Sequence, residues 1–183
     1  MVSKGYSVAA VLLTVAVAAP LAQKTEQVHP GKAGSPHVRT TATIDGATVS
    51  VEYGRPSLKG RTPGKDVDPF MGKPWRTGAD EATVLTTDKP LKFGSLSLAP
   101  GSYTLNTQPG EKGWELIVGK LGKPGQWGVP YQSALEIGRA PMTAGKAAAP
   151  AEQLTISLED TPAGGTLKID WGTTSATIPF TVG

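Results

Sequence analysis

The chain contains no cysteine and only two histidines among its 183 residues. Without cysteine there is no disulfide framework, no lipid-modified thiol and no thiolate chemistry. His29 and His37 are too few for a three-histidine zinc site and form no HExxH motif. The chain also lacks three common motifs: GxSxG of serine hydrolases, GxxxxGK[ST] of nucleotide-binding proteins and GxGxxG of dinucleotide-binding proteins. We therefore predict no cofactor and no metal site.

Two metal alternatives have weaker support. His37 together with Asp80 or Glu81 offers a small ligand set, but a lone histidine at a domain entrance is more commonly a capping or surface residue. Asp66 and Asp68 lie in one Gly- and Pro-bounded loop and could bind calcium. Acidic residues in such a turn are far more commonly solvated.

Neither sign of charge dominates the chain, which has 18 basic and 15 acidic residues. The basic residues form no run of five or more, and the four tryptophans do not alternate with them. These features argue against a nucleic-acid partner. The length suits one ordinary domain rather than two.

Long apolar runs are confined to the N-terminus, where Val8 to Ala19 follows the basic residue Lys4. This pattern predicts a secretory signal peptide over residues 1–22, with cleavage after Ala18 or Ala22. The run is short for a membrane span, which needs about 20 apolar residues. We expect a periplasmic or secreted protein with no membrane span after cleavage; an uncleaved N-terminal anchor is the alternative.

The remaining chain divides into a short polar leader and one domain. Residues 23–36 are polar and contain Gly and Pro, which predicts a disordered leader. Residues 37–183 then form a single domain.

Within this domain, apolar residues recur with the period of two that is typical of half-buried strands. Val49, Val51 and Tyr53 share one face and follow an Asp45-Gly46 turn, which predicts a hairpin with residues 37–44. Further strands are expected at 82–87, 91–93, 96–98, 103–107, 114–119, 154–158, 167–171 and 176–180. The fold class is therefore all-β: a two-layer antiparallel β-sandwich of nine or ten strands, with a jelly roll as one variant. Only 132–138 and 145–153 suggest a helical turn.

Polar side chains crowd into two short blocks, VEYGRPSLKGR and PWRTGADEATVL. Arginine binds carboxylate, phosphate or sulfate groups through two parallel hydrogen bonds, and tryptophan can stack on a sugar. A third segment, GQWG, places a tryptophan in a loop without a sheet face to bury it. The candidate ligand-binding residues are therefore Arg55, Arg61, Trp75, Arg76, Asp80, Glu81 and Trp127.

Three interpretations of these residues stay open. They form a binding site for a small polar or carbohydrate-like ligand, or they pair with one another and with Glu52 as internal scaffolding. The third is a carboxylate-dependent hydrolase of envelope or extracellular glycans. Neighbouring strand residues point to opposite faces, so Asp80 and Glu81 can serve one site only in a loop conformation; Glu52 with Glu81 is the alternative pair. The sequence does not decide whether the protein is an enzyme.

Several motifs also carry a resemblance. The resemblance is to a family of exported bacterial proteins that is known only as a domain of unknown function. It extends from Ser35 to Phe180 and is carried, in order, by the runs SPHVRTTATIDGATVSVEYGRPSLKGR, PWRTGADEATVLTT, LAPGSYTL, WELIV, GQWG, GRAPM and LKIDWGTTSATIPF. The resemblance implies an exported β-rich domain and no established activity. The family block often has Asn where this chain has Asp80, which disfavours a mechanism that needs an amide there. We expect a binding or structural module at the cell envelope.

Overall fold

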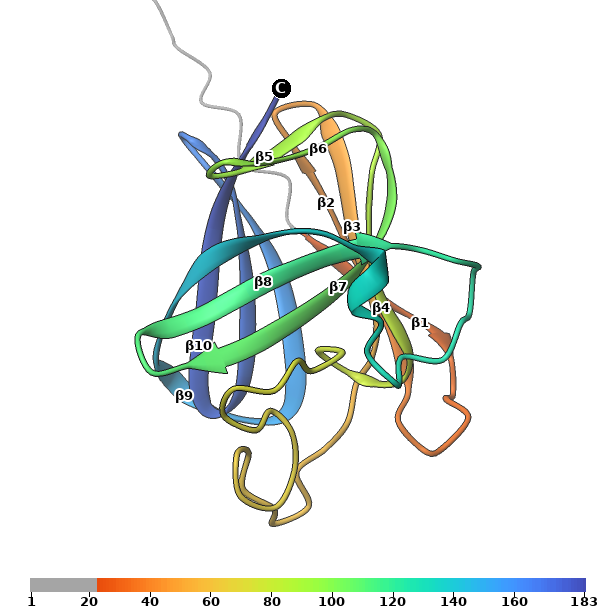
Figure 1. The fold of residues 1–183 in the computed structure, drawn as a ribbon, viewed down its shortest axis with the longest axis vertical. Coiled ribbons are helices and arrows are strands. Elements are labelled where there is room, and N and C mark those ends of the chain that lie inside the picture. Colours follow the sequence, from red (N-terminus) through yellow and green to blue (C-terminus); the bar gives the residue numbers. More distant parts are fainter. Residues whose placement is uncertain (1–22) are drawn as a thin grey trace, which may run out of the picture.

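The computed structural model describes residues 23–183, so the predicted signal peptide, residues 1–22, lies outside the described residues. Within this range the chain forms ten strands and one 3₁₀ turn (Figure 1): β1 (Lys24–His29), β2 (His37–Ile44), β3 (Ala47–Gly54), β4 (Ala79–Thr87), β5 (Leu91–Phe93), β6 (Leu96–Leu98), β7 (Gly101–Gly110), β8 (Gly113–Lys120), η1 (Ser133–Leu135), β9 (Glu136–Thr161) and β10 (Gly164–Val182). Among residues 23–183, no helix has the length and apolar character needed to cross a membrane.

The predicted hairpin between β2 and β3 is confirmed. Asp45 and Gly46 have φ values of 47° and 71°. Positive φ at both central residues gives a type I′ turn, whose twist matches that of the two strands. The alternation follows from this register, because Ala47, Val49 and Val51 on β3 are fully buried while Thr48 and Ser50 between them are more exposed.

All ten strands belong to one antiparallel sheet in the order β1-β2-β3-β4-β7-β8-β9-β10-β5-β6, and the sheet is not closed. The all-β prediction with nine or ten antiparallel strands is thus confirmed. The finer prediction of two separate layers stays a prediction, because the strands follow one another in a single hydrogen-bonded order.

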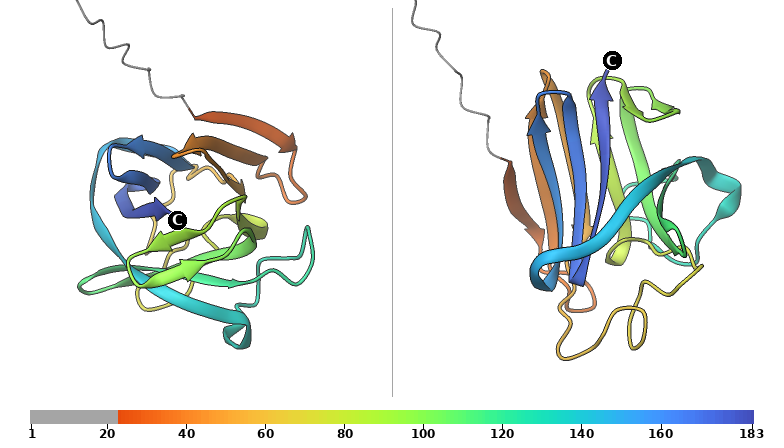
Figure 2. Two further views of the ribbon diagram at one scale, coloured as in Figure 1. Left: turned by 90° about the horizontal axis from the view of Figure 1, so that it is seen from above. Right: turned by 90° about the vertical axis from the view of Figure 1, so that its left-hand side faces the viewer.

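The sheet curls around one buried core, so strands far apart in the strand order approach each other (Figure 2). The buried hydroxyl of Tyr53 on β3 accepts a 2.9 Å hydrogen bond from the Ile156 amide on β9. Beyond β3 the chain continues beside β9, where the Leu154 amide donates to the Pro56 carbonyl over 3.0 Å. This contact fixes the start of the loop that leads toward the candidate site.

Two local predictions are wrong. Residues 24–29 of the predicted disordered leader form strand β1, which pairs with β2 from Lys24 opposite Thr41 onward. The strand is held by backbone hydrogen bonds and buries almost no side chain, so composition gives no sign of it. Residues 145–153 are part of strand β9, whereas the hint of a helical turn at 132–138 corresponds to η1.

Candidate functional site

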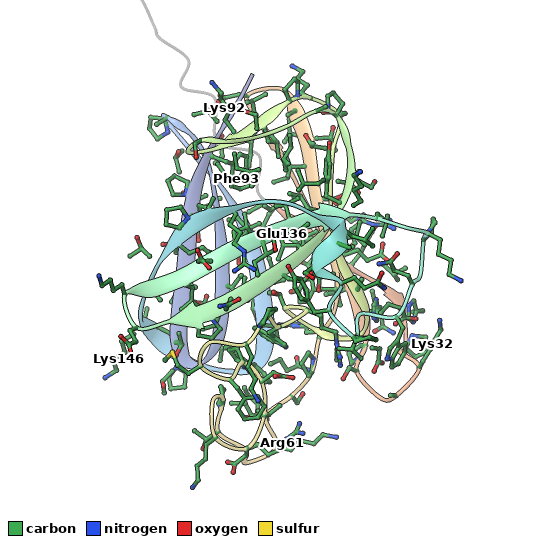
Figure 3. All side chains as sticks on the ribbon, in the orientation of Figure 1. Lys32, Arg61, Lys92, Phe93, Glu136 and Lys146 are labelled. Carbon is green, nitrogen blue, oxygen red and sulfur yellow. The ribbon has the colours of Figure 1, made fainter. Side chains whose placement is uncertain are left out.

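The candidate site lies at the end of the sheet where two loops meet. Residues 30–36 connect β1 with β2, and residues 55–78 connect β3 with β4. Figure 3 shows Lys32 of the first loop and Arg61 of the second at this end of the molecule, opposite Lys92 and Phe93. Most of the predicted site residues belong to the second loop or to the beginning of β4.

Strand β4 begins with a bulge that carries two carboxylates. Glu52 pairs with Val84, but Gly54 pairs with Ala79, so the four residues 80–83 face Tyr53 alone, three more than a regular ladder would have. Asp80 adopts a left-handed conformation with φ of 62°. As a result, the Asp80 and Glu81 side chains both reach the chain segment 29–37, which a regular strand would not allow.

Asp80 is a buried structural anchor for two loops. Its Oδ2 atom accepts a 3.0 Å hydrogen bond from the Ala33 amide. Its backbone carbonyl accepts a 3.1 Å hydrogen bond from the Gly128 amide. The side chain therefore holds loop 30–36, while the backbone holds the loop that contains Trp127.

Glu81 lies at the centre of a cluster with Lys32, His29 and His37, which we call the His-Glu cluster. Its Oε1 atom is 2.7 Å from Nζ of Lys32 and 3.9 Å from Nε2 of His29, and its Oε2 atom is 2.7 Å from Nε2 of His37. Burial alone would raise the pKa of Glu81, but the hydrogen bonds from Lys32 and from the backbone amide of Glu81 hold this pKa below its ordinary value. Glu81 is therefore ionised at neutral pH.

His37 is the most deeply buried member of the His-Glu cluster. Burial lowers the pKa of its imidazole, and the attraction of Glu81 offsets this only in part, so the ring is neutral at pH 7. Although Nε2 of His37 is close to Glu81, neither ring nitrogen has an aligned hydrogen-bond partner among residues 23–183. Gly54 leaves room for the ring, because a Cβ atom there would be 3.0 Å from Nε2.

Two of the predicted arginines act mainly within the scaffold. Nε of Arg55 donates to the Leu154 carbonyl over 3.1 Å, and its Nη2 donates to Oγ1 of Thr155 over 3.2 Å. Arg61 is exposed and donates to the carbonyls of Leu58 and Ser57 in its own loop. Arg55 thus fastens the loop to β9, whereas Arg61 shapes the loop tip.

Arg76 differs from every other arginine in the chain. The chain has five arginines, and Nε donates a hydrogen bond in Arg39, Arg55, Arg61 and Arg139. Nε of Arg76 is shielded from solvent and has no partner among residues 23–183. The aliphatic part of its side chain packs against Gly128, where a Cβ atom would be 2.4 Å from Cδ of Arg76.

Arg76 lines a cleft of about 390 Å³ between the two loops, which we call the Arg76 cleft. Three of the predicted candidates, Arg61, Trp75 and Arg76, contribute to its lining, together with the cation Lys59 and the carboxylate Asp68. Cations therefore outnumber anions around this cleft. The volume lies within the range of roughly 300 to 1,000 Å³ that is typical of small-molecule sites.

The predicted tryptophans do not provide a stacking platform in the Arg76 cleft. Trp75 is only 3% exposed, and its ring packs edge-on against Trp114. Trp127 is 46% exposed but lies outside this cleft, over a separate hollow lined by residues such as Lys123 and Val129. The structure thus brings Arg61, Trp75 and Arg76 together and leaves Arg55, Trp127 and the two carboxylates elsewhere.

Sequence reasoning did not identify His29 or Lys32 as site residues, and it gave His37 only as a minor metal alternative. The strand register, which the sequence does not show, is what brings these residues together. His37 pairs with Gly54, and Gly54 pairs with Ala79, so His37 and the residues after Ala79 lie on neighbouring strands. The position of His29 could not be inferred while its segment was taken as disordered.

Comparison with known proteins gives a family and no activity. Residues 35–180 match the model of a family described as "Protein of unknown function (DUF2911)". No curated protein and no solved structure matches the chain.

Proposed function

The chain belongs to the DUF2911 family of proteins of unknown function, and we propose that it is an exported binding module whose Arg76 cleft takes a small ligand with a carboxylate, phosphate or sulfate group. The export part of the proposal rests on the signal-like N-terminal sequence, and the binding part rests on the cleft.

The buried Nε atom of Arg76, which has no partner among residues 23–183, is the observation that carries the proposal. A buried donor without a partner costs free energy, more so when the group is charged. The four other arginines all satisfy Nε within the protein. A bound oxyanion would satisfy Arg76 in the same way, through the paired hydrogen bonds that a planar guanidinium forms.

The surroundings of Arg76 favour an anion over a neutral ligand. Lys59 and Arg61 add positive charge to the lining, while Asp68 is its only carboxylate-bearing residue. The nearly complete burial of Trp75 and Trp171 removes the flat aromatic faces that neutral sugars use. A carbohydrate-like ligand would therefore be recognised through an acidic group.

The alternative of a glycan hydrolase has less support. A general acid must carry a proton at the working pH, but the pKa of Glu81 is lowered, so this side chain is ionised at neutral pH. Asp80 is buried and uses its carboxylate to hold the Ala33 amide. Neither residue lines the Arg76 cleft.

A thermal-shift panel tests the proposal. The chain from Gln23 onward is screened against phosphate, sulfate, citrate and the pair glucuronic acid and glucose, which differ in a single carboxylate. Arg76→Gln removes the proposed anchor, and Arg39→Gln is the matched control, because Arg39 pairs with Glu52 on the strands outside the cleft.

We expect at least one anion to raise the melting temperature of the wild type and of Arg39→Gln. If the ligand is a sugar, glucuronic acid should raise this temperature and glucose should not. A ligand at 100 times its dissociation constant stabilises a protein by about 2.7 kcal/mol. Arg76→Gln should lose this response. An equal response in Arg76→Gln, or no response of the wild type to any anion, contradicts the proposal and favours a scaffolding role.

A further inference from the structure

We propose that the His-Glu cluster is a binding site for a divalent transition-metal ion of the zinc class, held by His29, His37 and Glu81. This site is separate from the Arg76 cleft, since none of the three side chains lines that cleft. The inference therefore does not depend on the proposed anion-binding function.

The first argument is the ligand set. One nitrogen from each histidine and one oxygen of Glu81 all lie within 4.8 Å of one another. Two imidazoles and one carboxylate form a donor set found in catalytic zinc sites, where a water molecule takes the fourth position. Ligand atoms of a tetrahedral zinc ion lie roughly 3.3 Å apart, which follows from bond lengths of about 2.0 Å. Nε2 of His29 is 3.9 Å from Oε1 of Glu81, and Nε2 of His37 is 2.7 Å from Oε2, so modest side-chain rotations would bring the three ligands to this spacing.

The second argument is the unused bonding capacity of the two buried members. Nε2 of His37 and the Oε2 atom of Glu81 are buried and have no aligned hydrogen-bond partner among residues 23–183. Nε2 and Oε2 face each other at 2.7 Å without the alignment of a hydrogen bond. If the two atoms moved slightly apart, a metal ion would bond to both lone pairs and remove the cost of leaving Nε2 and Oε2 unsatisfied.

The third argument is the position of His29 beside the two buried ligands. Its ring stacks on His37 with a centroid distance of 4.4 Å and an interplanar angle of 11°. The Nε2 atoms of His29 and His37 lie near Oε1 and Oε2 of Glu81, and the rings must tilt for both in-plane lone pairs to meet one ion. Nδ1 of His29 accepts a 3.1 Å hydrogen bond from the Gly31 amide, so the ring hydrogen lies on Nε2. Metal binding through Nε2 therefore requires the proton to move to Nδ1 and the Gly31 amide to turn away.

Lys32 occupies the position that would compete with the metal. Its ammonium lies 2.7 Å from Oε1 of Glu81, but 62% of its side chain is exposed. The ammonium can therefore swing into solvent when a cation of higher charge binds. Removing this ammonium should strengthen metal binding, a direction of change that a purely structural salt bridge would not produce.

The test is isothermal titration of the chain from Gln23 onward with Zn²⁺ alone, with the absorption of Co²⁺ as a second readout of tetrahedral coordination. We expect one ion per chain in the wild type. Loss of a residue that only supports a metal ligand weakens metal affinity by roughly 10- to 100-fold. His37→Gln and Glu81→Gln remove proposed ligands and should weaken Zn²⁺ affinity at least as much. Lys32→Met should tighten binding, and Glu115→Gln, a distant carboxylate variant, should leave binding unchanged.

Circular dichroism establishes that each variant is folded. If His37→Gln or Glu81→Gln does not fold, His29→Gln replaces it, because His29 is the most exposed of the three ligands, at 35%, and its loss disturbs the core least. Wild-type affinity in any folded variant of His29, His37 or Glu81 would overturn the proposal. Absence of Zn²⁺ binding by both the wild type and Lys32→Met would also overturn it.

Discussion

Gly128 lies so close to Arg76 that a Cβ atom on the glycine would be 2.4 Å from Cδ of the arginine. The same Cβ would also be 3.2 Å from the Ala82 amide nitrogen, so the new methyl group has backbone on its other side. The side chain of Arg76 would have to move. The loop after β8 thus sets the position of the guanidinium in the Arg76 cleft.

Gly128→Ala is therefore expected to weaken anion binding without changing any residue that contacts the ligand. Misalignment of a charge-assisted hydrogen bond by such a shift should cost about 1.4 kcal/mol, or tenfold in affinity. Titration of the anion found in the thermal-shift panel measures this change. Gly145→Ala is the control, because no atom lies within 4 Å of a Cβ built at this position; equal affinities for the two variants would contradict the role of Gly128.

Arg55 and Arg61 should differ in their effects on stability, although both lie in the same polar block. Arg55→Ala removes two hydrogen bonds that join the loop to β9 and should lower the free energy of unfolding by about 1–3 kcal/mol. Arg61 is exposed and bonds only within its own loop, so Arg61→Ala should change this free energy by no more than about 0.5 kcal/mol. Urea unfolding of the two variants measures the difference, and similar losses would contradict the assignment of Arg55 as the scaffold residue.

Tyr53→Phe should destabilise the curled sheet. The variant leaves the buried Ile156 amide without its 2.9 Å acceptor, which costs about 1–3 kcal/mol. Tyr103→Phe is the matched control, since the Tyr103 hydroxyl donates to the exposed Ala99 carbonyl, which water can reach. Chemical denaturation of both variants provides the comparison. A Tyr53→Phe variant as stable as the control would show that the contact between β3 and β9 contributes little.

Glu136 should make stability fall in acid. Both oxygens of Glu136 accept hydrogen bonds from Arg139, and Tyr131 also donates to this carboxylate. These bonds lower the pKa of Glu136 from 4.5. A lowered folded-state pKa means that the stabilisation is complete above the unfolded-state pKa and is lost as pH falls through the folded-state value.

The Glu136→Gln variant isolates this contribution. At pH 7 it should be less stable than the wild type by about 0.5–1 kcal/mol, the value of a partly exposed ion pair. The difference should shrink progressively as pH falls below 4.5, the ordinary pKa of the group. Unfolding curves recorded over this pH range check the prediction, and a difference that does not depend on pH would contradict it.

The strands could be predicted wherever one face is buried. Val49, Val51 and Tyr53 alternate because the core lies on one side of β3, and the Asp45-Gly46 turn fixes their register. Strand β1 could not be predicted, because its side chains are exposed and its pairing with β2 depends on the backbone.

The sequence indicates which polar residues are candidates for a site, but it does not indicate which of them lie together. The two polar blocks lie at the end of β3, in the loop after it and at the start of β4. The division into an Arg76 cleft and a His-Glu cluster depends on the bulge at Asp80 and on the pairing of His37 with Gly54. These are long-range features of register that local patterns do not encode.

The most direct test of the anion-binding proposal is the NMR signal of the arginine Nε–H groups. The chain has five arginines, and Arg76→Lys identifies the Arg76 signal by its disappearance. We predict that the anion selected in the thermal-shift panel moves the Arg76 signal most, while those of Arg55 and Arg139, already bonded within the protein, stay in place. An unchanged Arg76 signal at a saturating anion concentration would contradict the proposal.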